Sequence, residues 1–273
     1  METQLRTALR VRISRQEILR FAAETAFLFA VMVVYFLIRG GLPVRPEEAF
    51  DRANQVIRLE DRLGIFVEPR WQASILDSVT LMKIANWVYV WGHLPVLIGG
   101  AVWLYLRNRN RYRVYRNALL ISAFIALFGY GLFPVAPPRL LPEWGFVDTV
   151  ARLARQNYDM QPGFFVNHYA AVPSLHFGWA LLIGIALLDV DRNVLVRTFA
   201  VVMVAAMFFA IVLTANHFIF DMLVGSAIVL VAIAIAFALD NHHLGVRQSR
   251  REAAAAGHGE RQGAGTRLGG DQR

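Results

Sequence analysis

A histidine stands at the start of a long apolar segment, in the stretch VPSLHFGWALL. Pro173 there suits the first position of a helix, because its fixed backbone angle and missing N–H cost nothing at that place. Ser174 and His176 then fall in the first turn. Free backbone N–H groups and the positive end of the helix dipole bind anions such as phosphate at that point. The stretch therefore predicts an anion site with a hydroxyl and a proton donor beside it.

A second histidine lies in the stretch TANHFIFDMLVG, where His217 and Asp221 are four residues apart. On a helix they would share one face, and the carboxylate could accept the ring N–H that fixes the histidine tautomer. The other ring nitrogen would then be free as a base or nucleophile. An aspartate inside a membrane span is costly unless it is paired, so Asp221 itself indicates a polar site. Gly225, one turn further on, would let another helix approach this face.

An arginine follows two prolines in the stretch FPVAPPRLLPEWG. The prolines make this segment stiff and extended, so Arg139 is expected on a rigid support. A guanidinium held in this way suits bidentate binding of phosphate oxygens. Asn167 and His168, just before the Pro173 segment, are predicted to line the same site.

Membrane-spanning helices must position these residues. The chain has 273 residues, of which 56% are hydrophobic, and its mean hydropathy is +0.43, which is typical of a polytopic membrane protein. A helix needs about 20 residues to cross the hydrocarbon core. Six apolar runs reach or approach that length: Phe21–Ile38, Ile84–Leu106, Asn117–Phe133, Pro173–Leu188, Val196–Thr214 and His217–Leu239. We therefore expect an all-α protein with six transmembrane helices.

The arginines predict how these helices are oriented. The net charge is +8, and arginines gather before the first run, after the second, between the fourth and fifth, and after the sixth. The positive-inside rule puts all four segments, and so both termini, in the cytoplasm. The long loops 39–82 and 134–172 then lie outside. Each motif alone could be a helix cap, a structural pair or a turn, but all three reach the same outer face, which favours a functional interpretation.

The chain divides into three predicted parts. Residues 1–20 form a basic cytoplasmic N-terminus, residues 21–240 a six-span catalytic domain, and residues 241–273 a disordered cytoplasmic tail rich in Gly, Ala and Arg. The distribution of the arginines argues against nucleic acid as a partner. The chain has no cysteine for disulfide or thiolate chemistry, and no internal repeat is visible that would support a transporter.

These motifs resemble those of the type 2 phosphatidic acid phosphatase superfamily, which shares its helical core with the vanadium haloperoxidases. The P-S-G-H motif of the superfamily is similar to residues 173–176, and its H-x-x-x-D motif is similar to His217 and Asp221. The resemblance extends from about Tyr130 to Gly225 and includes the six-span plan. It implies a helical bundle of the phosphatase and haloperoxidase type.

The chain departs from the superfamily at three cationic or glycine positions. Leu132 stands where a lysine is usual, Ile211 where an arginine is usual, and Leu175 where the motif has glycine. The patterns PPR, PSLHFGW and NHxxxD resemble those of the inositol phosphorylceramide synthase branch. The missing cations leave Thr214, Asn216, His168 and backbone N–H groups as substitutes in the phosphate site.

The resemblance implies displacement at phosphorus in two steps, with no metal and no cofactor. His217 would attack and become a phosphohistidine, Asp221 would orient it, and His176 would protonate the departing oxygen. Arg139, Ser174 and the helix N-terminus would hold the phosphoryl oxygens. We expect a phospholipid, polyprenyl or sphingolipid-type phosphate as substrate, at the outer face of a bacterial-type plasma membrane. Water as acceptor would make the protein a phosphatase, and an alcohol such as inositol would make it a transferase.

Two other classes of function remain open from the residues. Two histidines and a carboxylate could hold non-haem iron as a facial triad, although an arginine and a helix N-terminus suit an anion better. A chelator would inactivate such an enzyme, whereas vanadate would inhibit phosphotransfer. A non-catalytic membrane protein could also use the pocket to bind lipid headgroups, and it would never release phosphate or exchange headgroups.

Overall fold

The computed structural model describes residues 14–153 and 167–242, and within these ranges the chain is helical and has no β-strand. The expectations for residues 1–13 of the basic N-terminus and for the tail from residue 243 lie outside the described residues. Ser14 begins the first helix: its side chain accepts the Glu17 N–H, and the Glu17 side chain accepts the Ser14 N–H in return.

Among the described residues, five helices are long and apolar enough to cross a membrane. They are α2 (Arg15–Gly40), the continuous segment Val79–Arg107, α7 (Arg109–Leu132), α10 (Val194–Leu213) and the last helix, Ile219–His242. The segment Val79–Arg107 consists of α5 (Val79–Trp87), a π-helical turn (Val88–Gly92) and α6 (His93–Arg107). The prediction of an all-helical, polytopic membrane protein is confirmed.

The fourth predicted span, residues 173–188, is a shorter helix, α9 (Leu175–Val190), with 16 residues. It contacts α6, α7 and α10, and most of its side chains are buried, among them Leu182 and Ile183. Gly178 of α9 and Gly225 of the last helix allow close contact, because a Cβ at Gly178 would lie 3.1 Å from the Gly225 carbonyl oxygen. Gly225 therefore has the packing role predicted for it.

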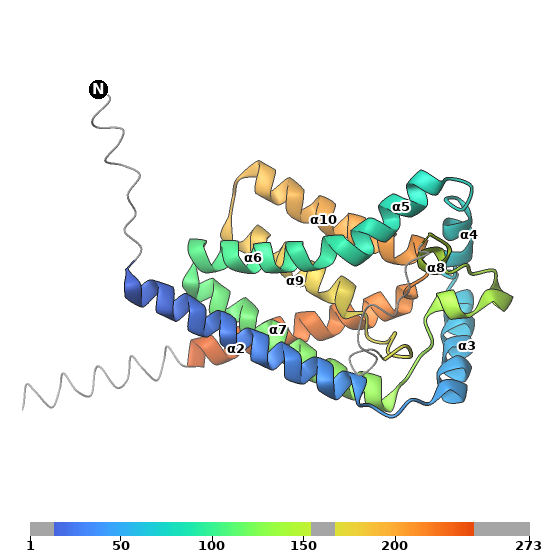
Figure 1. Ribbon diagram of the computed structural model, residues 1–273, viewed down its shortest axis with the longest axis horizontal. Helices are drawn as coiled ribbons and strands as arrows, with labels where there is room; N and C mark the ends of the chain where they lie inside the picture. The colour runs from blue at the N-terminus through green and yellow to red at the C-terminus, as the bar shows by residue number, and fades with distance from the viewer. Residues whose placement is uncertain (1–13, 154–166, 243–273) are drawn as a thin grey trace, which may run out of the picture.

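The remaining helices gather at one end of the bundle, which we call the loop end (Figure 1). They are α3 (Pro46–Arg62), α4 (Glu68–Ala73), the 3₁₀ turns Pro138–Leu140 and Pro142–Trp144, and α8 (Thr149–Leu153). The connections between α6 and α7 and between α9 and α10 lie at the opposite end, together with the start of α2 and the end of the last helix. We call this the arginine end, because it carries the arginine-rich segments.

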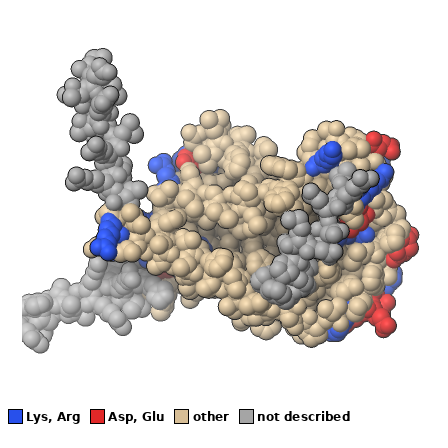
Figure 2. Space-filling view, viewed as in Figure 1, with Lys and Arg blue, Asp and Glu red and all other residues tan. Residues whose placement is uncertain are grey.

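Charged side chains gather at these two ends, and the middle of the visible face is almost entirely uncharged (Figure 2). Many large apolar side chains of the long helices are exposed, including Phe29, Ile98 and Leu230. An uncharged band of exposed apolar side chains is what a helical bundle presents to lipid tails.

Candidate active site

His217 and Asp221 lie together at the loop end, as their spacing predicts, but not on one helix face. The last helix begins at Ile219, so His217 belongs to the loop before it. The His217 Nδ1 atom lies 3.2 Å from the Asp221 Oδ2 atom and 2.9 Å from the Ala171 carbonyl oxygen. Both neighbours are acceptors, so Nδ1 carries the proton and Nε2 keeps its lone pair. The ring nitrogen that is needed for attack on phosphorus is thus the free one.

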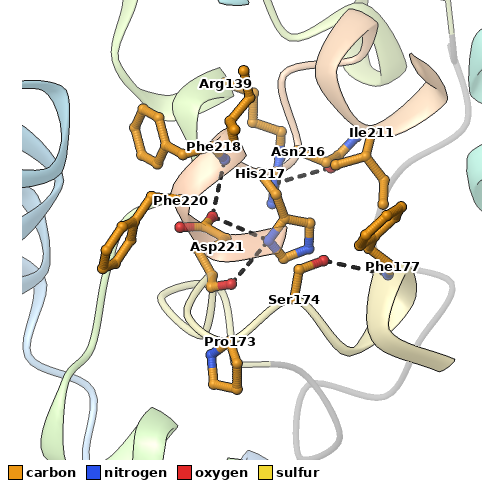
Figure 3. Close-up of polar contacts among 12 residues, drawn as sticks. Arg139, Pro173, Ser174, Phe177, Ile211, Asn216, His217, Phe218, Phe220 and Asp221 are labelled. Carbon is orange, nitrogen blue, oxygen red and sulfur yellow. Dashed lines mark hydrogen bonds and ion pairs between the residues drawn. The ribbon is translucent and has the colours of Figure 1, made fainter. Parts of the chain in front are cut away.

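Asp221 organises the start of the last helix as well as the histidine. Its carboxyl is fully buried, and Oδ2 also accepts the Phe218 N–H at 3.0 Å (Figure 3). The backbone carbonyl of Asp221 accepts the Ser174 N–H at 3.0 Å. This bond joins the Ser174 segment directly to the His217 segment, so two motifs 40 residues apart in sequence form one structure.

The helix that carries His176 begins two residues later than predicted, at Leu175. Ser174 is the N-cap of α9, so Pro173 stands before the cap and not at the first helical position. The Ser174 hydroxyl accepts the Phe177 N–H at 3.4 Å, and the residue is fully buried. His176 remains in the first turn, where the helix N–H groups and dipole favour an anion.

The His176 ring lies between two aromatic neighbours that the sequence interpretation did not include in the site. Its centroid is 4.8 Å from that of Tyr89 in the π-helical turn and 4.7 Å from that of His93. The His217 centroid is 6.2 Å away. At this distance the two rings are direct neighbours, so a group bound to one histidine would lie close to the other. His93, a buried residue at the start of α6, thus contacts a candidate catalytic group.

Arg139 is held at the site by both its backbone and its side chain. Its N–H donates to the Ala215 carbonyl at 2.8 Å, and Nη1 donates to Asn216 Oδ1 at 3.2 Å (Figure 3). Asp148 Oδ2 lies 3.6 Å from the Arg139 Nε atom. Ala215 has φ of 54°, a left-handed conformation in the turn that places its carbonyl toward Arg139.

The four predicted lining residues occupy different surroundings. Thr214 is fully buried, and its hydroxyl donates to Ala210 O at 2.6 Å and accepts from Asn216 Nδ2 at 2.7 Å. Asn216 is therefore fixed between Thr214 and Arg139. Asn167 is buried and accepts the N–H of Tyr169, whereas His168 is exposed. Thr214 and Asn216 therefore position Arg139. The structure shows no contact between His168 and either His176 or His217.

Two buried glutamates, one from α3 and one from α4 at the loop end, contact the start of the last helix. Glu60 of α3 accepts the Phe220 N–H at 2.7 Å, and Glu68 of α4 accepts the Ile219 N–H at 2.9 Å. Both side chains are fully buried and lie close enough to share a hydrogen bond. Burial, followed by the neighbouring Glu68 carboxyl, raises the pKa of Glu60 to about 9, so Glu60 is protonated at neutral pH. Sequence analysis missed this pair, because both residues stand in an amphipathic loop region that resembles ordinary surface helix.

An apolar cavity of about 170 Å³ lies beside the histidines, between the Val79–Arg107 segment, α9 and α10. Its lining includes Trp87, His93, Trp179, Met203 and Met207. The cavity borders His93, whose ring contacts His176, so an apolar chain in it would end near the candidate proton donor.

The arrangement can bind an anion and provide a nucleophile and a proton donor on either side of it. Within the described residues, no three His, Cys, Asp or Glu side chains converge in a way that could hold a metal ion. The facial-triad alternative therefore lacks a ligand set there, since His176 faces aromatic rings while His217 is held by Asp221.

Comparison with known proteins agrees with this chemistry. A model of the PAP2 superfamily matches residues 54–235, which contain all the predicted site residues. The phosphoinositol dihydroceramide synthase of Bacteroides thetaiotaomicron is 27% identical to the chain over 177 residues, or 59% of this chain and 57% of the relative. The match thus covers less than two thirds of the relative. No solved structure matches the chain.

Proposed function

Because the chain belongs to the PAP2 superfamily, we propose that it transfers the phosphate-bearing headgroup of a membrane lipid through a covalent intermediate on His217. The observation that carries the proposal is the geometry of His217. Its Nδ1–H is held by two acceptors, which leaves Nε2 free in a ring whose centroid lies 6.2 Å from that of His176. A ring fixed in this tautomer is the form that can attack phosphorus.

In the first step, the lone pair of His217 Nε2 forms a bond to phosphorus, and the bond from phosphorus to the lipid alcohol oxygen breaks. The proton of His176 passes to that oxygen, and the lipid alcohol leaves. His217 keeps its Nδ1–H, so the phosphorylated ring is positive, and Asp221 at 3.2 Å balances that charge. Arg139 holds phosphoryl oxygens as negative charge shifts between them.

In the second step, neutral His176 takes the proton of an acceptor hydroxyl, whose oxygen attacks phosphorus. The bond from phosphorus to Nε2 breaks, and both histidines return to their starting states. Water as acceptor gives hydrolysis, and an alcohol gives headgroup transfer. The name of the relative pairs a phosphoinositol group with dihydroceramide. We therefore propose a phosphoinositol lipid as donor and a long-chain lipid alcohol as acceptor, ahead of water or free inositol.

The apolar cavity supports a lipid substrate. Its volume of about 170 Å³ accommodates part of an acyl chain, and it borders His93 beside the proton donor. A lipid whose tail entered there would present its headgroup oxygen to His176, while the phosphate faced His217.

The test is transfer by the purified protein in lipid nanodiscs that contain phosphatidylinositol and isotopically labelled dihydroceramide. Mass spectrometry would follow three products: labelled dihydroceramide that carries phosphoinositol, free inositol phosphate, and the released diacylglycerol. We expect labelled product from wild type and none from His217→Ala, with His242→Ala at the arginine end as the matched control. Release of inositol phosphate without transfer to dihydroceramide would mean that the protein is a hydrolase and not a transferase. Binding of the donor with no turnover to any acceptor would instead support the non-catalytic alternative.

We also propose that the loop end faces away from the cytoplasm. The arginines at the opposite end support this orientation through the positive-inside rule. Since the chain has no cysteine, single cysteines can be introduced at positions 139 and 110 and labelled in intact cells. An impermeant probe should label position 139 only. Labelling of position 110 alone would reverse the orientation.

A further inference from the structure

We propose that Arg39, at the end of α2, is a second cation that binds a phosphate oxygen of the substrate. This inference rests on the proposed function and adds a binding residue to it. Arg39 lies outside the region that the superfamily model matches, which starts at residue 54. It comes from α2, whereas the other candidate groups come from the Pro138–Leu140 turn, from the start of α9 and from residues 217–221.

Arg39 is a partly buried cation with no carboxylate beside it. No hydrogen bond or ion pair joins it to another described side chain, and its Nε atom is buried without an acceptor. Its one described contact is with the Tyr130 ring, whose centroid lies 5.1 Å from the guanidinium carbon. By contrast, Arg45 and Arg52, at the same end of the bundle, both pair with Glu48. A desolvated guanidinium without a counter-ion is costly, so an anion that reaches it gains affinity.

The place of Arg39 is fixed relative to the start of α9. Tyr130, on which Arg39 rests, donates its hydroxyl proton to the Pro173 carbonyl at 3.0 Å. The neighbouring Gly129 lies so close to this turn that a Cβ there would be 2.7 Å from Pro173 Cδ. One aromatic side chain therefore separates Arg39 from the Pro173–Ser174 turn that leads to His176.

Electrostatic contact gives the same placement. The charge of Arg39 acts on the His176 ring, and the charges of Arg39 and Arg139 both act on Tyr89, which stacks on that ring. Both guanidinium groups thus lie within electrostatic range of the same aromatic neighbour of the proton donor, and they come from different elements, α2 and the Pro138–Leu140 turn.

The chemistry of phosphoryl transfer has a use for a second cation. Negative charge is spread over several phosphoryl oxygens in the transition state, and one guanidinium cannot contact all of them. Arg139 is also partly engaged by Asp148 and Asn216. Arg39 is not shared in this way, so its full charge is available to an oxygen on the α2 side of the site.

The experiment compares Arg39→Gln and Arg39→Lys with wild type in the headgroup-transfer assay. Arg58→Gln is the matched control, because Arg58 is exposed on α3 at the same end. Loss of one charge-assisted hydrogen bond should lower kcat/KM about 10- to 100-fold in Arg39→Gln, with partial recovery in Arg39→Lys. Arg58→Gln should match wild type. The thermal midpoint of each protein is measured alongside, since a role limited to the helix end or to Tyr130 would lower stability without changing kcat/KM.

Orthovanadate binding separates this inference from the proposed function. We expect vanadate to raise the thermal midpoint of wild type and of Arg58→Gln. Vanadate should bind Arg39→Gln about tenfold or more weakly than it binds wild type. If wild type binds vanadate in this way but transfers no headgroup, the proposed function fails and the role of Arg39 stands. If headgroup transfer depends on His217 but Arg39→Gln keeps wild-type kcat/KM and vanadate affinity, the role of Arg39 is overturned.

Discussion

Carboxylates occupy both ends of the bundle, and the loop end holds fully buried ones in addition to partly exposed pairs such as Arg45 with Glu48. At the arginine end, Glu17, Glu24, Asp189 and Asp191 form partly exposed pairs with arginines, for example Arg116 with Glu24 at 2.7 Å. At the loop end, Glu60, Glu68 and Asp221 are fully buried and accept backbone N–H groups or a histidine N–H. Exposed ion pairs are worth little, because water screens them, whereas a buried carboxyl without its partners is costly.

The carboxylates at the two ends therefore have different structural roles. The partly exposed pairs join surface side chains that water also solvates. The buried carboxyls instead fix the conformation of one short stretch, residues 217–221, through their hydrogen bonds. Changes at the loop end should therefore alter activity or stability strongly, and equivalent changes at the arginine end should not.

The largest effect is expected for His217→Ala. Removing the nucleophile should lower kcat by at least about 10³-fold, because no other group near phosphorus can form the covalent intermediate. Headgroup transfer in nanodiscs measures it, with His242→Ala as the control. Activity of His217→Ala within about twofold of wild type would rule out the assignment of the nucleophile.

Replacing His176 should give the next effect, and it should depend on the leaving group. His176→Gln should lose about 10²- to 10⁴-fold with a lipid alcohol leaving group and much less with a substrate whose leaving group needs no proton. The wild-type rate should rise and then fall with pH, because one histidine must be neutral to attack while the other must carry a proton. With the activated substrate, the variant should lose the high-pH limb and keep the low-pH limb. An unchanged bell would reject His176 as the acid.

Asp221→Asn should be less severe than loss of His217, with a decrease in kcat of about 10²-fold. The Ala171 carbonyl still accepts the Nδ1–H at 2.9 Å, so the tautomer is not lost with the carboxylate. What is lost is the negative charge beside the phosphorylated ring. Rapid-quench measurement of the two steps tests this, because the decrease should fall on formation of the intermediate. Equal losses in Asp221→Asn and His217→Ala would mean that Ala171 O cannot hold the ring alone.

The pH dependence of stability should expose the buried glutamate pair. The pKa of Glu60 is raised to about 9 by burial and by the Glu68 carboxyl, with Asp221 acting in the same direction and the Phe220 N–H opposing it. Between its ordinary value of 4.5 and about 9, the folded chain binds more protons than the unfolded chain. The free energy of unfolding therefore falls as pH rises through this window.

Glu60→Gln imitates the protonated side chain, so its stability should vary less across the same window. Glu60→Ala leaves the Phe220 N–H without its acceptor and should cost about 1–3 kcal/mol at pH 6. Thermal unfolding in one detergent from pH 5 to pH 9 measures both. If Glu60→Gln and wild type show the same slope, Glu60 is not the group that titrates.

The smallest effect is expected at the arginine end. Glu17→Gln removes the pair with Arg109, in which both side chains are nearly half exposed, and should change stability by less than about 1 kcal/mol. High salt should remove even this difference. A loss as large as that of Glu60→Ala would show that exposure does not separate the two ends.

Much of the site could be predicted from single short stretches of sequence, because contacts between residues a few positions apart depend on their spacing in the chain. The spacing of His217 and Asp221 predicts their contact even though the helix starts two residues after the histidine, since a tight turn brings the same groups together. The start of α9 was predicted two residues early, because the proline fits equally well before the cap. Composition and arginine placement also predict the orientation of the apolar helices, and this orientation stays a prediction. The count of spans stays a prediction as well, because α9 is short.

The sequence by itself determined the class of protein, the histidine pair, the paired aspartate and the rigid arginine, because apolar runs and i to i+4 spacings act within one segment. Only the tertiary structure decided which distant groups complete the site. Glu60 and Glu68 reach the last helix across about 150 residues of sequence, His93 and Tyr89 stack on His176 from another helix, and Arg39 arrives from α2. None of these residues carries a local signal, since a glutamate on an amphipathic helix or an arginine at a helix end is ordinary. Their partners are set by helix packing, and so the buried carboxyls and the second cation become visible only when the bundle is assembled.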